Sequence, residues 1–456
     1  MRLMTLHALS PLDGRYQKET APLQDFFSEF AYLRTRTRLE LDFLSALSKT
    51  GLIPAESLVD YKPEPFSFSD DDAGEIQEYE KITRHDVKAI EYYLREIIPS
   101  ELHAFIHFGL TSEDINNTAQ ALALLNSRDQ ILLPAFDELL AALRSFAVKH
   151  RALPMLARTH GQPAVPTTLG KEIAVYLARL TTCRNELAGH SFEAKLTGAV
   201  GNFNALQASA PHVDWLAFSK DFIESQGLRA NLVTTQILPY DNWIRYFQAL
   251  QLTNAVLVDL AQDMWRYISD GIFKQKVVAN EVGSSTMPQK VNPIDFENAE
   301  GNLGLANALF VHYTQKLSVS RLQRDLSDST VRRSFGTAFG HTLLAWKNLT
   351  KGMARVDADE ERIRAELGAH WEIVSEGAQT ILRAAGRSDA YETLKSRTRG
   401  SQMDGFSYKV WVEALGVDAD VREKLMNLSP ERYIGLAIEI TDEALRNSIL
   451  ENRSTN

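Results

Sequence analysis

The segment 283–293, GSSTMPQKVNP, carries serine hydroxyls, a lysine and an asparagine within a few residues. The backbone N–H groups of a Gly-Ser-Ser start can converge on an anion, while Lys290 adds a positive charge and Asn292 an amide donor. Such donors stabilise the charge that develops on a carbanion or an oxyanion. A polar surface loop without a chemical role has a similar composition, so both interpretations stay open.

His160 is the one histidine of eleven that lies in a polar turn bordered by Gly and Pro, RTHGQP at 158–163. An imidazole exposed there can exchange a proton with a substrate near neutral pH. A structural histidine is the alternative. His85 lies between Arg84 and Asp86, where Asp86 could be the N-cap of a helix that starts at Val87, with Arg84 as a surface cation.

A basic segment follows near position 330 of this acidic chain. Two serines lie between its two pairs of arginines, a composition that suits a phosphate. Its members are Arg321, Arg324, Ser327, Ser329, Arg332 and Arg333. A solvated helix face balanced by Asp325 and Asp328 explains the composition equally well.

Several common sites are missing from the sequence. His103 and His107 have a spacing that can bind zinc, but no H-E-x-x-H pattern surrounds them. Phosphate-binding G-x-x-x-x-G-K-[ST], dinucleotide-binding G-x-G-x-x-G after a strand and the G-x-S-x-G elbow are also absent. We therefore expect neither a metal nor a cofactor.

The composition of the 456 residues is that of a globular protein, with 44% hydrophobic and 24% charged residues. A net charge of −10 disfavours nucleic acid and anionic membranes as partners. Cys183 is the only cysteine, which excludes an internal disulfide, and its neighbours have a helical pattern. Since we find no signal peptide and no long apolar run, we expect a cytoplasmic protein.

Apolar residues recur at helical spacing through most of the chain, whereas strand patterns are scarce. The pattern predicts helices over 29–49, 243–268, 296–317, 337–353 and 371–385, and it recurs over 133–147, where Pro134 marks a helix start or a kink, and 173–187. The segment 243–268 can extend for roughly 40 Å and needs helical partners. The fold class is mainly α, with predicted domains 1–111, 112–355 and 356–456.

The segment 283–293 resembles the signature loop of the fumarase/aspartase superfamily, whose members cleave C–N or C–O bonds to release fumarate. Other motifs resemble one branch of this superfamily, the adenylosuccinate lyases of bacterial type. These motifs are SPLDGRY at 10–16, RHDV at 84–87, TSEDI at 111–115, THGQP at 159–163 and the segment 324–333. The resemblance extends from about residue 10 to the C-terminus.

The resemblance implies a three-domain helical fold in which long central helices form the core of a homotetramer, with each active site built from three subunits. It also implies a carbon–nitrogen lyase that releases fumarate by anti β-elimination from small phosphorylated succinyl-purine substrates. These are adenylosuccinate, giving AMP, and the succinyl-aminoimidazole-carboxamide ribotide of purine biosynthesis, giving the free carboxamide ribotide.

The same resemblance implies residue roles. Ser284 would be the base, His160 the acid and Glu297 the carboxylate that keeps His160 cationic, while Lys290 and Asn292 would hold the carboxylate of the carbanion. Arg15, Tyr16, Arg324, Ser329 and Arg333 match positions that bind phosphate and ribose. His85, Asp86, Thr111, Ser112 and Gln236 match contacts to base and succinyl groups, and Arg84 stands where some relatives have Asn.

Two alternatives remain. A sister lyase, such as one acting on argininosuccinate, aspartate or malate, shares the serine loop. Fumarase and aspartase substrates carry no phosphate, so the cations Arg15, Arg324 and Arg333 discriminate against those branches. A non-enzymatic scaffold with this fold would have no use for the intact set Ser284, His160 and Lys290.

Overall fold

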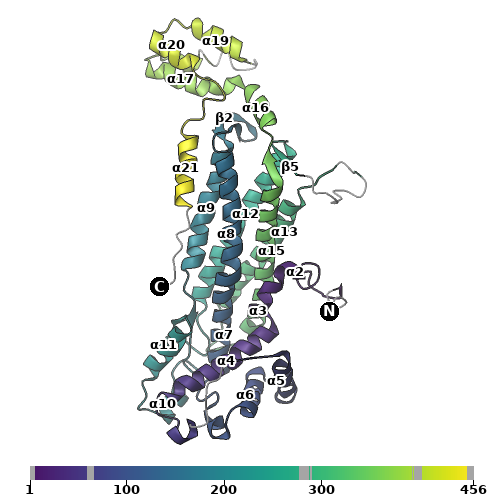
Figure 1. The fold of residues 1–456 in the computed structure, drawn as a ribbon. Coiled ribbons are helices and arrows are strands. Elements are labelled where there is room, and N and C mark those ends of the chain that lie inside the picture. Colours follow the sequence, from purple (N-terminus) through teal and green to yellow (C-terminus); the bar gives the residue numbers. More distant parts are fainter. Residues whose placement is uncertain are drawn as a thin grey trace. The chain divides into compact units, whose positions relative to one another are not determined.

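The computed structural model describes residues 6–58, 66–276, 287, 290–392, 394 and 403–448, and within them the protein is mainly α-helical, as predicted (Figure 1). The chain divides into two compact units. Unit 1 comprises Met1–Phe136, Cys183–Ala255 and Gly301–Ala345, and unit 2 comprises Asp137–Thr182, Val256–Glu300 and Trp346–Asn456. The three-domain division at residues 111 and 355 stays a prediction.

The first part of the chain consists of short helices around one longer helix. Its helices are α2 (Gln17–Thr20), η1 (Ala21–Leu23), α3 (Gln24–Phe27), α4 (Glu29–Ser48), η2 (Ala55–Leu58), α5 (Asp70–Thr83), α6 (Asp86–Ile97), η3 (Ser100–Phe105) and α7 (Ser112–Ser127). Helix α4 begins at its N-cap Ser28, whose hydroxyl accepts from the Ala31 N–H, and ends before Gly51 at φ +76°. Both ends agree with the predicted helix 29–49.

Five longer helices follow. They are α8 (Leu133–Lys149), α9 (Leu169–Gly189), α12 (Asp241–Ser269), α13 (Ile294–Leu317) and α15 (Phe335–Arg355), and each boundary between the two units falls within one of them. The predicted helices 243–268, 296–317 and 337–353 are confirmed to within two residues at each end. Buried Cys183 lies in α9. No described helix is long and apolar enough to cross a membrane.

Helices α7 and α8 are joined by a π-helical turn, η4 (Arg128–Leu132). Pro134 lies in the first turn of α8 and cannot donate a backbone hydrogen bond. A wider turn just before a proline removes the clash of its ring with the preceding carbonyl groups. The chain therefore continues as a helix, and Pro134 marks both a helix start and an irregular turn.

The strands form three small sheets in the described part of the chain, as the scarcity of strand patterns predicts. They are β1 (Pro154–Thr159) with β2 (Gln162–Thr168), β3 (Glu193–Ala194) with β4 (Arg229–Ala230), and β5 (Phe273–Gln275) with β6 (Val356–Ala358). The pair β3–β4 is parallel and the other two are antiparallel. Each sheet contributes buried side chains to the core, such as Leu156, Ala194 and Phe273.

Unit 1 has an aromatic core where α12, α13 and α15 meet. The Phe247 ring lies 4.9 Å from Phe335 and 5.8 Å from Phe310, centroid to centroid. Such edge-to-face and stacked pairs add to the free energy of burial. The short helices α10 (Asn204–Ser209), α11 (Trp215–Ser225) and α14 (Ser327–Arg332) also belong to this unit.

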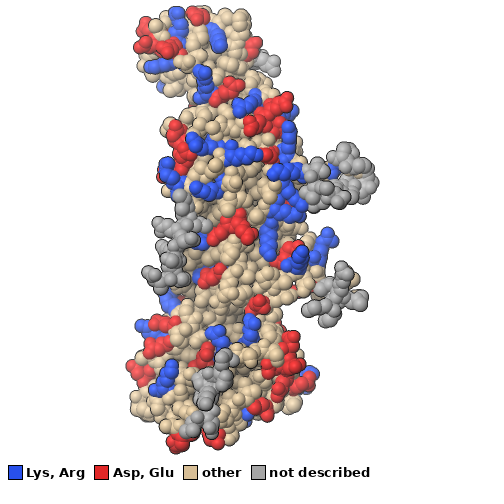
Figure 2. Space-filling view, viewed as in Figure 1, with Lys and Arg blue, Asp and Glu red and all other residues tan. Residues whose placement is uncertain are grey.

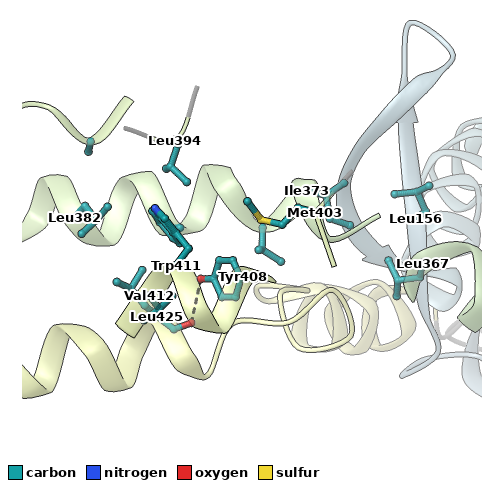
Figure 3. Packing of buried hydrophobic residues seen from close by; sticks show 13 residues of the cluster. Leu156, Leu367, Ile373, Leu382, Leu394, Met403, Tyr408, Trp411, Val412 and Leu425 are labelled. Atoms are coloured by element: carbon teal, nitrogen blue, oxygen red, sulfur yellow. Dashed lines mark hydrogen bonds between the residues drawn. The ribbon is translucent and has the colours of Figure 1, made fainter. Parts of the chain in front are cut away.

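The C-terminal helices of unit 2 enclose a separate apolar cluster. These helices are α16 (Glu360–Gly368), η5 (Trp371–Val374), α17 (Ser375–Ala384), α19 (Gly405–Glu413) and α20 (Ala419–Met426), whereas the last described helix, α21 (Ala437–Asn447), contributes no residue to the cluster. Figure 3 shows Leu156 of strand β1 at the edge of this cluster, beside Leu367 and Ile373, and the Tyr408 hydroxyl donating to the Leu425 carbonyl at 3.0 Å. The cluster thereby anchors the β1–β2 hairpin.

Acidic and basic side chains lie close together over much of the face in Figure 2. Exposed ion pairs such as Arg38–Asp42 and Arg266–Asp270 show this mixing within single helices. Charges of both signs so close together weaken the attraction of that face for a long polyanion.

His103 and His107 do not form a metal site. Helix η3 ends before His107, so the two side chains do not share a helix face. His103 Nε2 donates to the Ile98 carbonyl at 3.1 Å, and His107 Nδ1 lies 2.6 Å from Glu40 Oε1. No group of three or more metal-binding side chains occurs among the described residues.

The buried Glu40–His107 pair makes stability depend on pH. Burial alone would lower the pKa of His107, but the Glu40 carboxylate raises it above its ordinary value. Because the folded-state pKa is the higher one, this stabilisation is fully present below about pH 6.5 and disappears as pH rises through the folded pKa.

We expect Glu40→Gln to lower the free energy of unfolding by about 2 kcal/mol at pH 6, because protonated His107 loses its buried partner. The difference from the wild type should shrink by pH 9. Urea unfolding of both proteins at pH 6 and pH 9, at one protein concentration, measures it. Equal differences at the two pH values would contradict this account.

Candidate active site

His160 lies at the tip of the β1–β2 hairpin. Thr159 pairs with Gln162, and the two residues between them, His160 and Gly161, have φ values of +53° and +73°. Two positive φ values are typical of the type I′ turn that joins antiparallel strands. The predicted polar turn is confirmed, and the His160 side chain is exposed on it.

The hairpin is held at its base. Leu156 packs in the apolar cluster of the C-terminal helices, and the Arg158 guanidinium pairs with Glu366 of α16. The strand is thus fixed while its tip stays accessible. In this arrangement the His160 imidazole is accessible to a ligand that is bound by residues outside the hairpin.

Ser284 lies outside the described residues, as do its neighbours in 277–286. Lys290, which is exposed, and Asn292 are described just before α13. Gln275 Nε2 of β5 donates to the Val291 carbonyl at 3.0 Å, which ties this end of the loop to the β5–β6 sheet. The Pro293 carbonyl accepts the first backbone hydrogen bonds of α13 from Phe296 and Glu297, so the helix begins directly after this proline.

Glu297 is exposed on the first turn of α13, where its Oε1 accepts from Trp265 Nε1 at 3.1 Å. Both residues belong to unit 2, as does His160. The structure shows no bond from Glu297 to His160 among the described residues of one chain. The pairing of Glu297 with His160 therefore stays a prediction.

The turn between α5 and α6 differs from its prediction. Arg84 ends α5 with φ +51° and is exposed, and the N-cap of α6 is His85, whose Nδ1 accepts from the Lys88 N–H at 3.1 Å. The predicted cap Asp86 is the first residue of the helix. Since Nδ1 accepts this bond, Nε2 carries the proton of a neutral His85 and is a donor.

Asp86 accepts from the Val87 N–H through Oδ1 at 2.9 Å and pairs with two arginines through its other oxygen. Its Oδ2 lies 2.6 Å from Arg36 Nη1 and 3.4 Å from Arg333 Nη2. Burial alone would raise the pKa of Asp86, but the Arg36 guanidinium lowers it below its ordinary value. The charged Asp86 carboxylate thus connects the turn at His85 with Arg333 of the basic segment.

Thr111 and Ser112 start the long helix α7. The Thr111 N–H donates to Asp114 Oδ2 at 2.9 Å, and the other oxygen, Oδ1, accepts from the Thr197 N–H at 2.9 Å. Asp114 also pairs with Lys195 at 2.8 Å, and both side chains are wholly buried. This positions the positive end of the helix dipole beside the loop 197–202, a favourable place for a carboxylate group.

Gln236 links that loop to the basic segment. Its Nε2 donates to the Ala199 carbonyl at 3.1 Å, and its Oε1 accepts from Arg324 Nη1 at 3.2 Å. Two residues of the predicted site, Gln236 and Arg324, are therefore in direct contact.

The basic segment is only partly a solvated helix face. Arg321 is 83% exposed, as that interpretation requires, whereas the Arg332 side chain is 2% exposed and pairs with Asp328 at 3.0 Å. The backbone carbonyl of Ser329 on α14 accepts at 3.2 Å from the N–H of Arg333, the C-cap residue of that helix. The segment thus combines buried and accessible arginines.

Arg15 and Tyr16 lie before α2. The Arg15 guanidinium is exposed, and its central carbon lies 5.8 Å from the centroid of the Tyr16 ring. Asp13 of the same motif and Arg333 line one cavity of about 480 Å³ in unit 1. The N-terminal motif and the basic segment are therefore neighbours.

The structure adds four buried charges that the sequence did not single out. They are Arg36, Glu113, Asp114 and Lys195, and each holds a predicted site residue or its neighbour in place. The motif TSED includes Glu113 and Asp114, but nothing in its letters identifies their partners.

Two family descriptions match the chain: "Lyase" over residues 14–307 and "Adenylosuccinate lyase C-terminal" over 320–434. Adenylosuccinate lyase of Vibrio cholerae is 45% identical over 97% of this chain and 100% of its own length. Those of Legionella pneumophila and Escherichia coli are 44% and 42% identical, over 96% and 97% of this chain and 99% and 100% of their own lengths.

Solved structures with a similar fold have low sequence identity. A fumarate lyase from Mesorhizobium sp. BNC1 has a TM-score of 0.73 at 18% identity, covering 93% of this chain and 97% of its own. The 3-carboxy-cis,cis-muconate lactonizing enzyme from Pseudomonas putida has a TM-score of 0.72 at 19% identity, covering 94% and 97%. These two likenesses concern the fold alone.

At Gly201 the loop 197–202 lies very close to the backbone of Thr234 and Thr235. Gly201 has φ +86°, and a Cβ there would lie 2.1 Å from the Thr234 carbonyl oxygen. Gly201→Ala should therefore separate the loop 197–202 from the segment that carries Gln236 and lower kcat/KM at least about 10-fold.

Gly51→Ala is the matched control, because Gly51 has φ +76° but open space around its Cβ position. It should lose about 1 kcal/mol of stability and little activity. Steady-state kinetics and thermal unfolding of both variants separate the two effects. Equal activities would contradict a role for this close approach in the site.

Proposed function

Because the chain belongs to the adenylosuccinate lyase family, we propose that it eliminates fumarate from adenylosuccinate to give AMP, and from the succinyl-carboxamide ribotide of purine biosynthesis. A base removes a proton from the succinyl Cβ, the electron pair forms the new C=C bond, the C–N bond breaks, and an acid protonates the departing nitrogen. The near full-length identity to adenylosuccinate lyases carries this proposal.

In this mechanism Ser284 is the base and His160 the acid. A serine hydroxyl is a weak base, so its alkoxide needs N–H donors of its own loop and the charge of Lys290. The exposure of His160 at a rigid hairpin tip supports its role, since an acid must reach the leaving nitrogen.

Lys290 and Asn292 bind the carboxylate next to the carbon that loses its proton. As negative charge moves onto this carboxylate, their interactions strengthen and lower the barrier. Glu297 keeps His160 cationic in the proposal. Its carboxylate is exposed, which leaves it accessible to a histidine from another subunit.

Unit 1 contains the other proposed binding groups. Thr111, Ser112 and Gln236, together with His85 and Asp86, are proposed to contact the base and succinyl parts. The phosphate and ribose are assigned to Arg15, Tyr16, Arg324, Ser329 and Arg333. The contacts Asp86–Arg333 and Gln236–Arg324 support one continuous site, because each joins a member of the first group to a member of the second.

An absorbance assay tests the activity directly. Loss of the succinyl substituent changes the ultraviolet spectrum of the purine, so purified protein and adenylosuccinate suffice. No spectral change under conditions in which the protein is folded would refute the proposal. The match to the adenylosuccinate lyase C-terminal family favours this substrate over argininosuccinate.

We further propose a cytoplasmic homotetramer with three domains per subunit and active sites shared by three subunits. Large apolar side chains exposed on the long helices support such an assembly, including Leu252 at 55%, Trp265 at 42% and Leu305 at 56% exposure. The long helices need apolar partners, and other subunits would supply them.

Ser284→Ala and His160→Ala should each lower kcat at least about 100-fold without unfolding the protein, since each removes a proton-transfer group. Mixing the two variants under conditions of subunit exchange should restore part of the activity, because a shared site can then take both intact groups.

Each variant incubated alone is the control for this mixing experiment. Absence of recovery in demonstrated hybrid oligomers would count against shared sites. Near wild-type turnover of Ser284→Ala would instead refute the assignment of the base.

The phosphate assignment predicts substrate discrimination. Arg324→Lys should raise the KM for adenylosuccinate about 10-fold, since lysine cannot replace a guanidinium that donates two parallel bonds. The wild type should also process phosphate-free succinyl-adenosine with a kcat/KM at least about 100-fold lower, because remote binding energy positions the reacting bond. A ratio within a few-fold would overturn the assignment and reopen the choice among sister lyases.

A further inference from the structure

Glu113 follows Ser112 on α7, and its carboxylate is wholly buried between two arginines of the basic segment. Arg332 donates from Nη1 to Oε1 at 2.7 Å and from Nη2 to Oε2 at 3.0 Å. Arg324 Nη2 lies 3.2 Å from the same Oε2. One carboxylate therefore orients two guanidinium groups.

Arg332 neutralises the buried charge and is itself almost inaccessible to solvent. Its side chain is 2% exposed and also reaches Asp328 at 3.0 Å and Gln120 at 2.7 Å. The Tyr240 hydroxyl donates to Asp328 at 2.8 Å and lies 3.3 Å from Glu113 Oε1. Burial raises the pKa of Tyr240 well above its ordinary value, so this phenol keeps its proton.

Arg324 differs from Arg332 because it reaches solvent. Its side chain is 17% exposed, and two contacts fix its plane: Nη1 with Gln236 Oε1 and Nη2 with Glu113. Its Nε is buried and has no hydrogen-bond partner among the described residues. A guanidinium has five N–H donors, so a fixed orientation still leaves donors for an anion.

We propose that Glu113 is a positioning residue for substrate phosphate: it holds Arg324 in the orientation in which the guanidinium receives that group. The inference rests on the proposed function, which assigns Arg324 to the phosphate. A negative charge beside an anion site is unfavourable in itself. Orientation outweighs this effect because Arg332 and Arg324 would repel each other without their common counter-ion.

Glu113→Gln tests the proposal. The amide keeps the size of the side chain but loses the charge and replaces one acceptor by a donor facing arginine. We expect the KM for adenylosuccinate to rise roughly 10- to 100-fold, the usual effect of removing a group that orients a ligand-binding side chain. The kcat/KM for succinyl-adenosine should change less than about 3-fold, because that substrate makes no use of the oriented guanidinium.

Glu40→Gln, assayed at pH 8, is the matched control. It also removes a buried carboxylate of unit 1, but Glu40 pairs with His107, and among the described residues no hydrogen bond or ion pair joins Glu40 to a proposed site residue. This variant should retain wild-type ratios of kcat/KM for the two substrates. Circular dichroism verifies folding of both variants.

A double variant separates positioning from general stability. If Glu113 acts through Arg324, Glu113→Gln with Arg324→Lys should raise the KM no more than the larger single effect. A rise in KM equal to the product of the two single effects would overturn the proposal. So would tighter binding of adenylosuccinate by Glu113→Gln, or an equal loss for both substrates.

Failure of the proposed function has a different signature. A wild type without preference for the phosphate-bearing substrate refutes the phosphate assignment whatever Glu113 does, whereas a normal preference that survives Glu113→Gln refutes only the role of Glu113. If Glu113→Gln does not fold, Glu113→Asp replaces it. Its shorter side chain cannot span both arginines, and an unchanged KM for adenylosuccinate in that variant would also overturn the proposal.

Discussion

Asp114 and Lys195 form an ion pair in which both side chains are wholly buried, and the start of α7 depends on it. Removing either partner would leave an uncompensated charge, at a cost of about 3–5 kcal/mol. The same carboxylate accepts from the Thr111, Thr197 and Gly198 N–H groups, so it connects the helix start with the loop 197–202. Gln236 then bonds to that loop, and Arg324 bonds to Gln236.

The two units contribute groups of different character. In unit 1 the site residues are fixed by buried charges, as Asp86 is by Arg36, which preorganises them before a ligand arrives. In unit 2 His160 and Lys290 are exposed in a single chain. We propose that the active sites are shared between subunits. Side chains that contact a ligand bound mainly by another subunit must lie on the surface of their own chain, which explains why His160 and Lys290 are exposed.

Periodicity and end signals predicted most of the fold, as α12 and α4 illustrate, because an amphipathic helix depends on local spacing. The β1–β2 hairpin was not predicted, since prolines at 163 and 166 and an irregular register near Leu156 break its alternation. Motifs pointed to the candidate site residues but not to their partners. Glu113 and Arg332 are 219 positions apart, so no local pattern predicts that they pair.

Backbone strain explains why the site turns were difficult to predict. The described residues other than glycine with positive φ are Arg84, His107, His160, Phe203 and Leu322. Arg84 precedes His85, Leu322 lies two positions before Arg324, and His160 is itself a candidate. Each such conformation costs about 1–2 kcal/mol and persists only where surrounding contacts enforce it. The side chains of Arg84 and Leu322 give no sequence signal for a left-handed turn, so tertiary contacts, and not local preference, set the backbone there. His160 differs, because Gly161 beside it favours a turn and allowed that turn to be predicted.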